Sequence, residues 1–353
     1  MNKDDFGIEI DFLPVGDGSR SADAIGIRYG DLTSGDPLKQ WVVIIDGGTK
    51  QSGQALVELV KTHYKTGYVD LVVMTHPDRD HASGLTEVLN SLNVGELWMH
   101  RPWLHSTDIR QHFIDGRITD SSLERRLRVS MDAAHEVEQI ALEKGINIIE
   151  PFEGTVSADA VVTVLGPSKP YYQSLLPEFS KTPESESAIG KAVGLFSRAV
   201  AWITESFAEE HLPGGNTSAE NDSSAILLLR VAGRKHLIVG DAGVPALRAA
   251  NTYAATQGIR LDNLSFMQVP HHGSKKNVNT EILDAIKASI AFISAAKEGA
   301  PKHPSQRVIN ALVKRNTNVC VTKGTHVYYH HNIPWRAGWS SIPSLEFQAT
   351  YQE

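Results

Sequence analysis

The stretch LVVMTHPDRDHASGL, residues 71–85, decides the fold, because an apolar run leads directly into a cluster of metal-binding side chains. VDLVVMT (69–75) is almost continuously apolar, which is typical of a strand buried on both faces of its sheet. ASGLTEVLNSL (82–92) has the apolar spacing of a helix. The turn between them carries His76, Asp78, Asp80 and His81.

Imidazole and carboxylate groups in this density suit Zn²⁺, Mn²⁺ or iron. The alternative is a helix N-terminus with aspartate caps and incidental histidines. Three further strand ends favour the metal. WVVIID ends at Asp46, KHLIVGD ends at Asp241, and LSFMQVP leads into His271 and His272. Strand ends collect along one edge of a sheet, so we expect one metal centre at that edge.

The amino-acid composition and net charge limit the classes of function that the chain can have. The chain has 353 residues, of which 41% are hydrophobic, and a net charge of −7. This charge argues against bulk electrostatic binding of nucleic acid or acidic membranes, but it leaves a local basic groove open. The single cysteine, Cys320, excludes an intrachain disulfide. No apolar leader and no run of 18 apolar residues is found, so we expect a cytoplasmic protein without a membrane partner.

The pattern of elements predicts one α/β domain over residues 1–353, with two mixed sheets face to face and helices outside. Helices are predicted over 54–66, 121–145 and 183–212. Residues 168–220 are predicted to form a helical insertion between two strands. Its apolar face could be a surface for a protein partner, a lid, or a face that packs onto the core.

Six segments together resemble the metallo-β-lactamase fold superfamily. More narrowly, they resemble the soluble hydrolase domain of ComEC-type DNA-uptake competence proteins and their free-standing relatives. The segments occur in that group's order: IEIDFLPVGDGSRSADAIGI, VVIIDGG, ENDSSAILLLR, LIVGDAG, VPHHGS and APKHPSQRVINAL, with THPDRDH after the second. The resemblance implies a four-layer αββα sandwich. The insertion and the tail after Gly324 lie outside it.

The resemblance also implies a ligand set. His76 and Asp78 match the first-ion positions, and Asp80 and His81 match the second-ion positions. Asp241 matches the carboxylate that bridges two ions. The last ligand matches His271 or His272, with the choice between them open, while Asp46 supports the site from behind.

One position departs from the resemblance. Gly166, in VTVLGPSK, stands where relatives often have a histidine ligand. His100 or His105 could fill the gap, although a place in the site wall or at the surface is the other reading for both. Ser224 is expected to anchor a turn beside the site rather than act as a nucleophile. We therefore expect one or two Zn²⁺ or Mn²⁺ ions.

The chemistry expected of this site is hydrolysis. A bound metal lowers the pKa of a water toward neutrality, and Asp80 is expected to orient that water and relay a proton. His303 is expected either to contact the developing charge or to be a buried, hydrogen-bonded histidine. Lys275 and Lys276 could hold phosphate, and Trp103 could stack against a base.

These residues favour a phosphodiesterase or nuclease acting on single-stranded or duplex DNA. One alternative is a metallohydrolase of a small phosphodiester, phosphocholine ester, lactone or thioester. Another is a partner-binding module with a degraded metal site, for which Gly166 is the sequence support.

Overall fold

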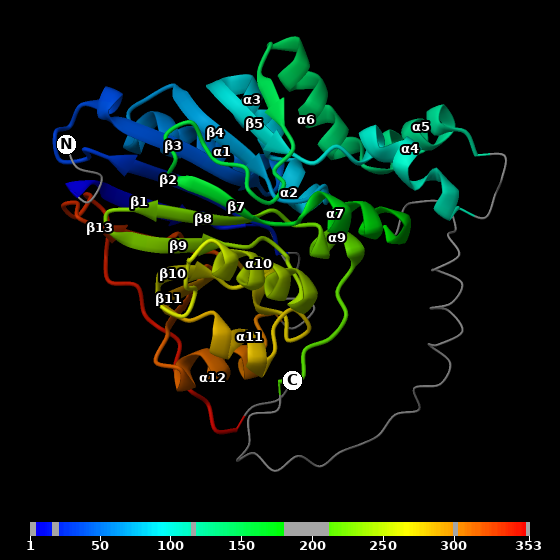
Figure 1. Ribbon diagram of the computed structural model, residues 1–353. Helices are drawn as coiled ribbons and strands as arrows, with labels where there is room; N and C mark the ends of the chain where they lie inside the picture. Colours follow the sequence, from blue (N-terminus) through cyan, green and yellow to red (C-terminus); the bar gives the residue numbers. More distant parts are fainter. Residues whose placement is uncertain (1–4, 16–20, 114–117, 180–211, 299–302, 351–353) are drawn as a thin grey trace.

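Two mixed β-sheets lie face to face, and helices cover their outer faces (Figure 1). This computed structural model describes residues 5–15, 21–113, 118–179, 212–298 and 303–350. One buried apolar cluster fills the space between the sheets, and two others lie between each sheet and its helices. The four-layer αββα sandwich expected from the sequence is confirmed.

The first sheet has seven strands in the order β13-β1-β2-β3-β4-β5-β6. Its strands are β1 (Gly7–Phe12), β2 (Ala24–Gly30), β3 (Gln40–Gly47), β4 (Tyr68–Met74), β5 (Asn93–Met99), β6 (Asn147–Ile149) and β13 (Val327–His331). β3 to β6 are parallel, whereas β2 is antiparallel to β3. The end of β3, the end of β4 and the start of β2 therefore share one edge of the sheet.

The second sheet has six strands in the order β12-β11-β10-β9-β8-β7. Its strands are β7 (Val162–Gly166), β8 (Ile226–Val231), β9 (Arg234–Ile238), β10 (Leu264–Gln268), β11 (Ala288–Ile293) and β12 (Asn318–Val321). β9 to β12 are parallel, so the loops after β9 and β10 leave from the same edge. β8 and β9 pair antiparallel, as the sequence predicts.

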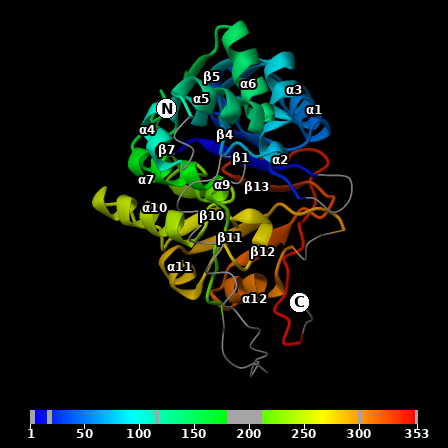
Figure 2. The ribbon, with the colours of Figure 1, turned by 90° about the vertical axis from the view of Figure 1, so that its right-hand side faces the viewer.

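The helices form the outer layers, as the perpendicular view in Figure 2 also shows. Over the first sheet they are α1 (Lys50–Glu58), α2 (Arg79–Ala82), α3 (Leu85–Ser91) and α6 (Asp132–Glu143). Over the second sheet they are α10 (Val244–Thr256), α11 (Thr280–Ala285) and α12 (Gln306–Lys314). One further helix, α5 (Asp120–Ser130), precedes α6. The remaining short helices and helical turns are η2 (Pro37–Lys39), η3 (Leu59–His63), η4 (Pro102–His105), α4 (Ser106–Ile109), η5 (Arg110–His112), α7 (Lys169–Leu175), η6 (Leu176–Glu178), α9 (Ala219–Asp222) and η7 (His271–Gly273).

Two helix predictions need correction. The helix predicted over 121–145 is two helices, α5 and α6, because Met131 has a non-helical backbone (φ −114°, ψ 48°). The helix predicted over 54–66 begins earlier, at Lys50, because Thr49 caps it by accepting a hydrogen bond from Ser52 N. The helix predicted over 183–212 lies almost wholly outside the described residues. No helix among the described residues is long and apolar enough to cross a membrane.

The C-terminal segment returns to the first sheet. β13 pairs antiparallel with β1, and Arg336 beyond it reaches two fully buried carboxylates, Glu9 and Asp11. Its Nη2 donates to Asp11 Oδ1 at 2.9 Å, and Nη1 contacts Glu9 Oε1. The segment after Gly324, which no sequence resemblance covers, thus completes the edge of the sandwich.

Candidate metal centre

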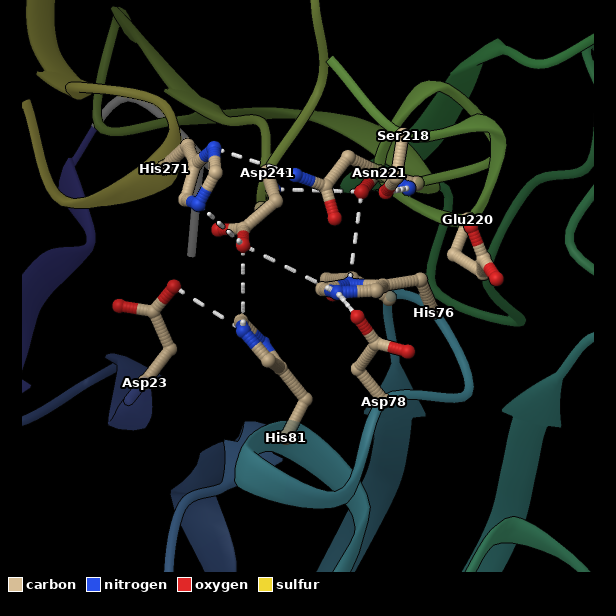
Figure 3. A network of polar contacts seen from close by, with 12 residues as sticks. Asp23, His76, Asp78, His81, Ser218, Glu220, Asn221, Asp241 and His271 are labelled. Atoms are coloured by element: carbon tan, nitrogen blue, oxygen red, sulfur yellow. Dashed lines mark hydrogen bonds and ion pairs between the residues drawn. The ribbon is translucent and has the colours of Figure 1, made fainter. Parts of the chain in front are cut away.

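Four histidine rings converge on one carboxylate oxygen of Asp241, and three of them, His76, His81 and His271, are labelled around it in Figure 3. His76 and His81 come from the loop and helix after β4, Asp241 follows β9, and His271 and His272 follow β10. The Nε2 atoms lie at these distances from Asp241 Oδ2: His81 3.6 Å, His271 3.8 Å, His76 3.9 Å and His272 4.0 Å. Both histidines of the His-His pair face the cluster, where the sequence left a choice between them.

Asp46 fixes His81 from behind. His81 Nδ1 lies 2.7 Å from Asp46 Oδ2, and both side chains are fully buried. A carboxylate accepts, so Nδ1 carries the proton and Nε2 presents a lone pair toward Asp241. Asp46 itself has a positive φ of 55° and accepts from Thr75 N at 2.8 Å.

His76 is held in the same tautomer through a relay. Thr75 Oγ1 donates to Asp46 Oδ2 at 2.7 Å, so its oxygen accepts from His76 Nδ1 at 3.1 Å. Ser224 Oγ lies 3.4 Å from the same Nδ1 and accepts from Asp241 N at 3.2 Å. Asp46 thereby orients two histidines, one directly and one through a hydroxyl.

The His-His pair has its own support. Asn277 Nδ2 donates to Asp241 O at 2.8 Å, which turns its Oδ1 toward His271 Nδ1 at 3.0 Å. His272 Nδ1 donates to Ser294 O at 3.0 Å. His272 Nε2 is thus left as an acceptor, while Asn221 Nδ2 also lies 3.1 Å from His271 Nδ1. His271 and His272 both have positive φ, 46° and 55°, a backbone that costs free energy in non-glycine residues and clusters at functional sites.

These residues fit a divalent cation. His76 Nε2, His81 Nε2 and Asp241 Oδ1 are buried and have no hydrogen-bond partner among the described residues. Several groups of three side chains each have one ligand atom per residue within 4.8 Å of the others, and we call them candidate ligand groups. Three of them are His76–His81–Asp241, Asp80–His81–His272 and Asp23–Asp241–His272. Buried lone pairs that point inward without a donor cost free energy unless a cation accepts them.

The pKa shifts reflect opposing effects. Burial raises the pKa of Asp241, but His272, His81 and His271 outweigh it and hold that pKa well below the usual range. Burial lowers the pKa of His81, and the carboxylates of Asp46 and Asp241 reverse this shift, so the net change is upward. Burial lowers the pKa of His272 to about 4, which keeps its ring neutral. Neutral imidazole is the form that binds metal.

The open side of the centre is lined by residues with partial exposure. The side chain of Asp78 is 40% exposed and its Oδ2 lies 3.7 Å from His76 Nε2. The side chain of His271 is 29% exposed. His303 is partly buried, and its ring lies 5.6 Å from that of His271. Lys275 and Lys276 are exposed just beyond the His-His pair. A ligand can therefore approach from this rim.

The prediction that Trp103 stacks against a base is wrong. Trp103 is 0% exposed and donates from Nε1 to Glu138 Oε1 at 3.1 Å, so it offers no ring face to a ligand. Glu138, the acceptor, lies on α6, and apolar side chains of α5 and α6 cover the turn that follows β5.

The histidines considered as replacements for the missing ligand lie elsewhere. His100 is 1% exposed and stacks on Tyr172 at 4.4 Å, and His105 Nε2 contacts Glu150 Oε1 at 3.1 Å. Neither belongs to a candidate ligand group with the four converging histidines. A Cβ added at Gly166 would meet Ala250 and Ile226, which are core residues rather than ligands.

Several residues of the centre were not singled out from the sequence. Asp23, at the start of β2, is 1% exposed and lies 3.9 Å from His81 Nδ1. Gln268, Asn221 and Asn277 provide orienting amides around the ligands. Asp23 could have been found, because the start of an antiparallel strand shares an edge with the ends of its parallel neighbours. The amides carry no sequence signal of this kind.

Comparison with known proteins shows the family to which this chain belongs. Residues 40–297 match the Metallo-beta-lactamase superfamily. ComE operon protein 3 of Bacillus subtilis (strain 168) is 24% identical over 340 residues, 91% of this chain and 34% of that protein. The chain thus spans about a third of this relative's length. Two similar solved structures are a CmlA beta-hydroxylase mutant (10% identity, 92% of this chain, 54% of that chain, TM-score 0.45) and a long form RNase Z from yeast (11% identity, 91% of this chain, 41% of that chain, TM-score 0.40).

Proposed function

Because this chain belongs to the metallo-beta-lactamase superfamily, a group of hydrolases, we propose that it is a metal-dependent phosphodiesterase that cuts DNA at the centre described above. The observation that carries the proposal is the convergence of four Nε2 atoms on Asp241 Oδ2. Four imidazoles and several carboxylates form the mixed donor set that Zn²⁺ or Mn²⁺ accepts.

The ligands divide into two sets around Asp241. We assign His76, Asp78 and His271 to one ion, and Asp80, His81 and His272 to the other. In this assignment His271 takes the place of the ligand that Gly166 lacks, because its Nε2 lies as close to Asp241 Oδ2 as that of His76. The centre is then complete for two ions, which disfavours a degraded site.

When bound, two divalent ions would supply an activated water at neutral pH and neutralise charge on the oxygens of a phosphodiester. Asp80, partly buried beside His81 and His272, would hold that water and accept its proton. His303 lies next to His271 on the rim and contacts the developing charge or the leaving oxygen. Burial lowers the pKa of His303 to about 4, so it acts as a neutral hydrogen-bonding group at pH 7.

Two observations support DNA as the substrate. The resemblance to the hydrolase domain of DNA-uptake proteins runs through most of the chain, and the match to ComE operon protein 3 covers 91% of it. Lys275 and Lys276 are exposed directly after the His-His pair, where cations can hold phosphates without reading sequence. With a net charge of −7, such a contact is local and sensitive to salt.

The test is cleavage of end-labelled single-stranded and duplex DNA with added Mn²⁺ or Zn²⁺. Wild type is expected to cut and Asp80→Ala to lose activity, while Asp262→Ala, at an exposed ion pair with Arg260, leaves it unchanged. If folded wild type cuts neither DNA with either metal, DNA is not its substrate. Small phosphodiesters, phosphocholine esters, lactones and thioesters are then assayed with the same variants.

A further inference from the structure

Asp23 is a carboxylate at the floor of the centre whose orientation is fixed. It is 1% exposed, and its Oδ2 accepts from Gln268 Nε2 at 2.8 Å. Gln268 cannot turn around, because its Oε1 already accepts from Val239 N at 3.0 Å and Gly240 N at 2.9 Å. The amide therefore holds one oxygen of Asp23 and leaves the other to face a different group.

The Oδ2 atom that Gln268 holds also faces His81, and His81 Nδ1, 3.9 Å away, gives its proton to Asp46 instead. Asp23 Oδ1 is buried and makes no hydrogen bond among the described residues. One oxygen of Asp23 does lie within 4.8 Å of ligand atoms of both Asp241 and His272. Figure 3 shows the Asp23 carboxylate directed toward the His81 ring, below His271 and Asp241.

The buried carboxylates at the floor of the centre need a positive charge nearby. Asp23, Asp46 and Asp241 are all at most 3% exposed. Among the described residues, no lysine or arginine forms an ion pair with any of the three, whose charged partners are histidines. Burial raises the pKa of Asp23 to about 7, and Asp241 and Asp46 add to the rise, while His81 and the Ser294 hydroxyl oppose it. A carboxylate that stays here as an anion needs a positive charge within contact distance.

We propose that Asp23 is an additional ligand of the metal centre, binding with one carboxylate oxygen the ion that Asp241, His272, His81 and Asp80 hold. The inference rests on the proposed metal-dependent function and deepens it. Gln268 acts as the positioning residue that holds Asp23.

Asp23→Asn isolates the ligand role. Asparagine keeps the size of the side chain and removes its negative charge, so a neutral amide takes the place of the carboxylate ligand. We expect bound Mn²⁺ or Zn²⁺, counted by elemental analysis after dialysis, to fall by one ion. If the number of ions stays the same, we expect the affinity of the variant for Mn²⁺ or Zn²⁺ in calorimetric titration to be at least about 10-fold weaker than that of wild type. The metal-free variant should unfold at the same or a higher temperature than wild type, because one buried like charge is gone.

The matched control is Asp70→Asn. Asp70 is a partly buried carboxylate that accepts from Val42 N at 2.7 Å and belongs to no candidate ligand group. Its replacement should leave metal content and affinity unchanged.

Two outcomes would contradict the inference in distinguishable ways. Equal ion content and an affinity within about 2-fold of wild type for Asp23→Asn overturn the role of Asp23 alone, whatever the substrate. Wild-type protein that binds neither metal overturns the metal-dependent function and the Asp23 ligand together. DNA cleavage is not needed to decide between them.

Discussion

His81 Nδ1 lies 2.7 Å from Asp46 Oδ2, and neither side chain has contact with solvent. The same Asp46 oxygen accepts from Thr75 Oγ1, whose oxygen in turn accepts from His76. Asp46 binds no ion in our assignment. It nevertheless fixes the tautomers of two proposed ligands, His81 directly and His76 through Thr75.

Asp46→Asn should weaken metal binding although it removes no ligand. The amide cannot accept from Thr75 N, Thr75 Oγ1 and His81 Nδ1 together, so the histidines lose their fixed orientation. We expect a 10- to 100-fold loss of Mn²⁺ or Zn²⁺ affinity in calorimetric titration, on the order reported for such outer partners. Asp159→Asn, at a carboxylate that accepts from Tyr29 Oη, is the control and should bind normally. Wild-type affinity in Asp46→Asn would contradict the orienting role.

His271→Ala should remove one bound ion, because our assignment makes His271 the substitute for the ligand missing at Gly166. Elemental analysis after dialysis measures the stoichiometry. Adding Gly166→His to this variant should not restore the ion, because a side chain there would meet Ala250 and Ile226. If His271→Ala retains two ions, or if Gly166→His restores the lost one, the assignment is wrong.

Replacing Lys275 and Lys276 together by alanine should weaken DNA binding more than it slows the chemical step. The two residues are exposed beyond the ligands. We expect KM for DNA to rise by roughly 10-fold with kcat within about 2-fold, and the dependence of log K on log salt to become shallower by about 1 to 2 units. Lys61→Ala, at an exposed lysine on the outer helix layer, serves as the control. An unchanged salt dependence would place the DNA elsewhere.

The free energy of unfolding should fall as the pH drops below about 6.5, in part through His236. This residue is 0% exposed, and burial lowers its pKa to about 3. Between those values the unfolded chain binds a proton that the folded chain excludes, so stability rises with pH across this window. At pH 5 the residue should cost about 2 kcal/mol relative to pH 7.

His236→Leu removes this proton site and should flatten the pH dependence by that amount in urea unfolding at the two pH values. His100, whose pKa burial also lowers to about 3, remains in both proteins and cancels in the comparison. An identical pH dependence in wild type and variant would contradict the prediction.

Arg336→Ala should destabilise the fold strongly. The guanidinium is 13% exposed and compensates Glu9 and Asp11, which are fully buried. Removing one partner of a buried ion pair costs about 3 to 5 kcal/mol, and we expect the lower end here because Glu9 keeps Arg28 and Asp11 keeps His326. Arg260→Ala, which breaks an exposed pair with Asp262, should change the free energy of unfolding by less than about 1 kcal/mol. A small effect of Arg336→Ala would show that Arg28 compensates Glu9 well enough alone.

The sequence predicted the sandwich and most of the residues that converge at the centre, because the same local pattern recurs. An apolar strand that ends in a carboxylate or imidazole is visible within a few residues, and parallel strands bring such ends together. It did not predict the place of Trp103, since burial there depends on Glu138 and the helices that cover the turn. The break at Met131 was also missed, because the apolar spacing continues across it. Whether the chain forms one domain over residues 1–353 stays a prediction.

The origin of the ligands has a consequence for how the molecule assembles. Asp23, His76 and His81 belong to the first sheet and its loops, whereas Asp241, His271 and His272 belong to the second. In the proposed assignment neither half of the chain supplies all the ligands, so complete coordination would require both sheets to be docked. The ions would then act as a removable cross-link between the sheets, and the free metal concentration around the protein would set the strength of that link.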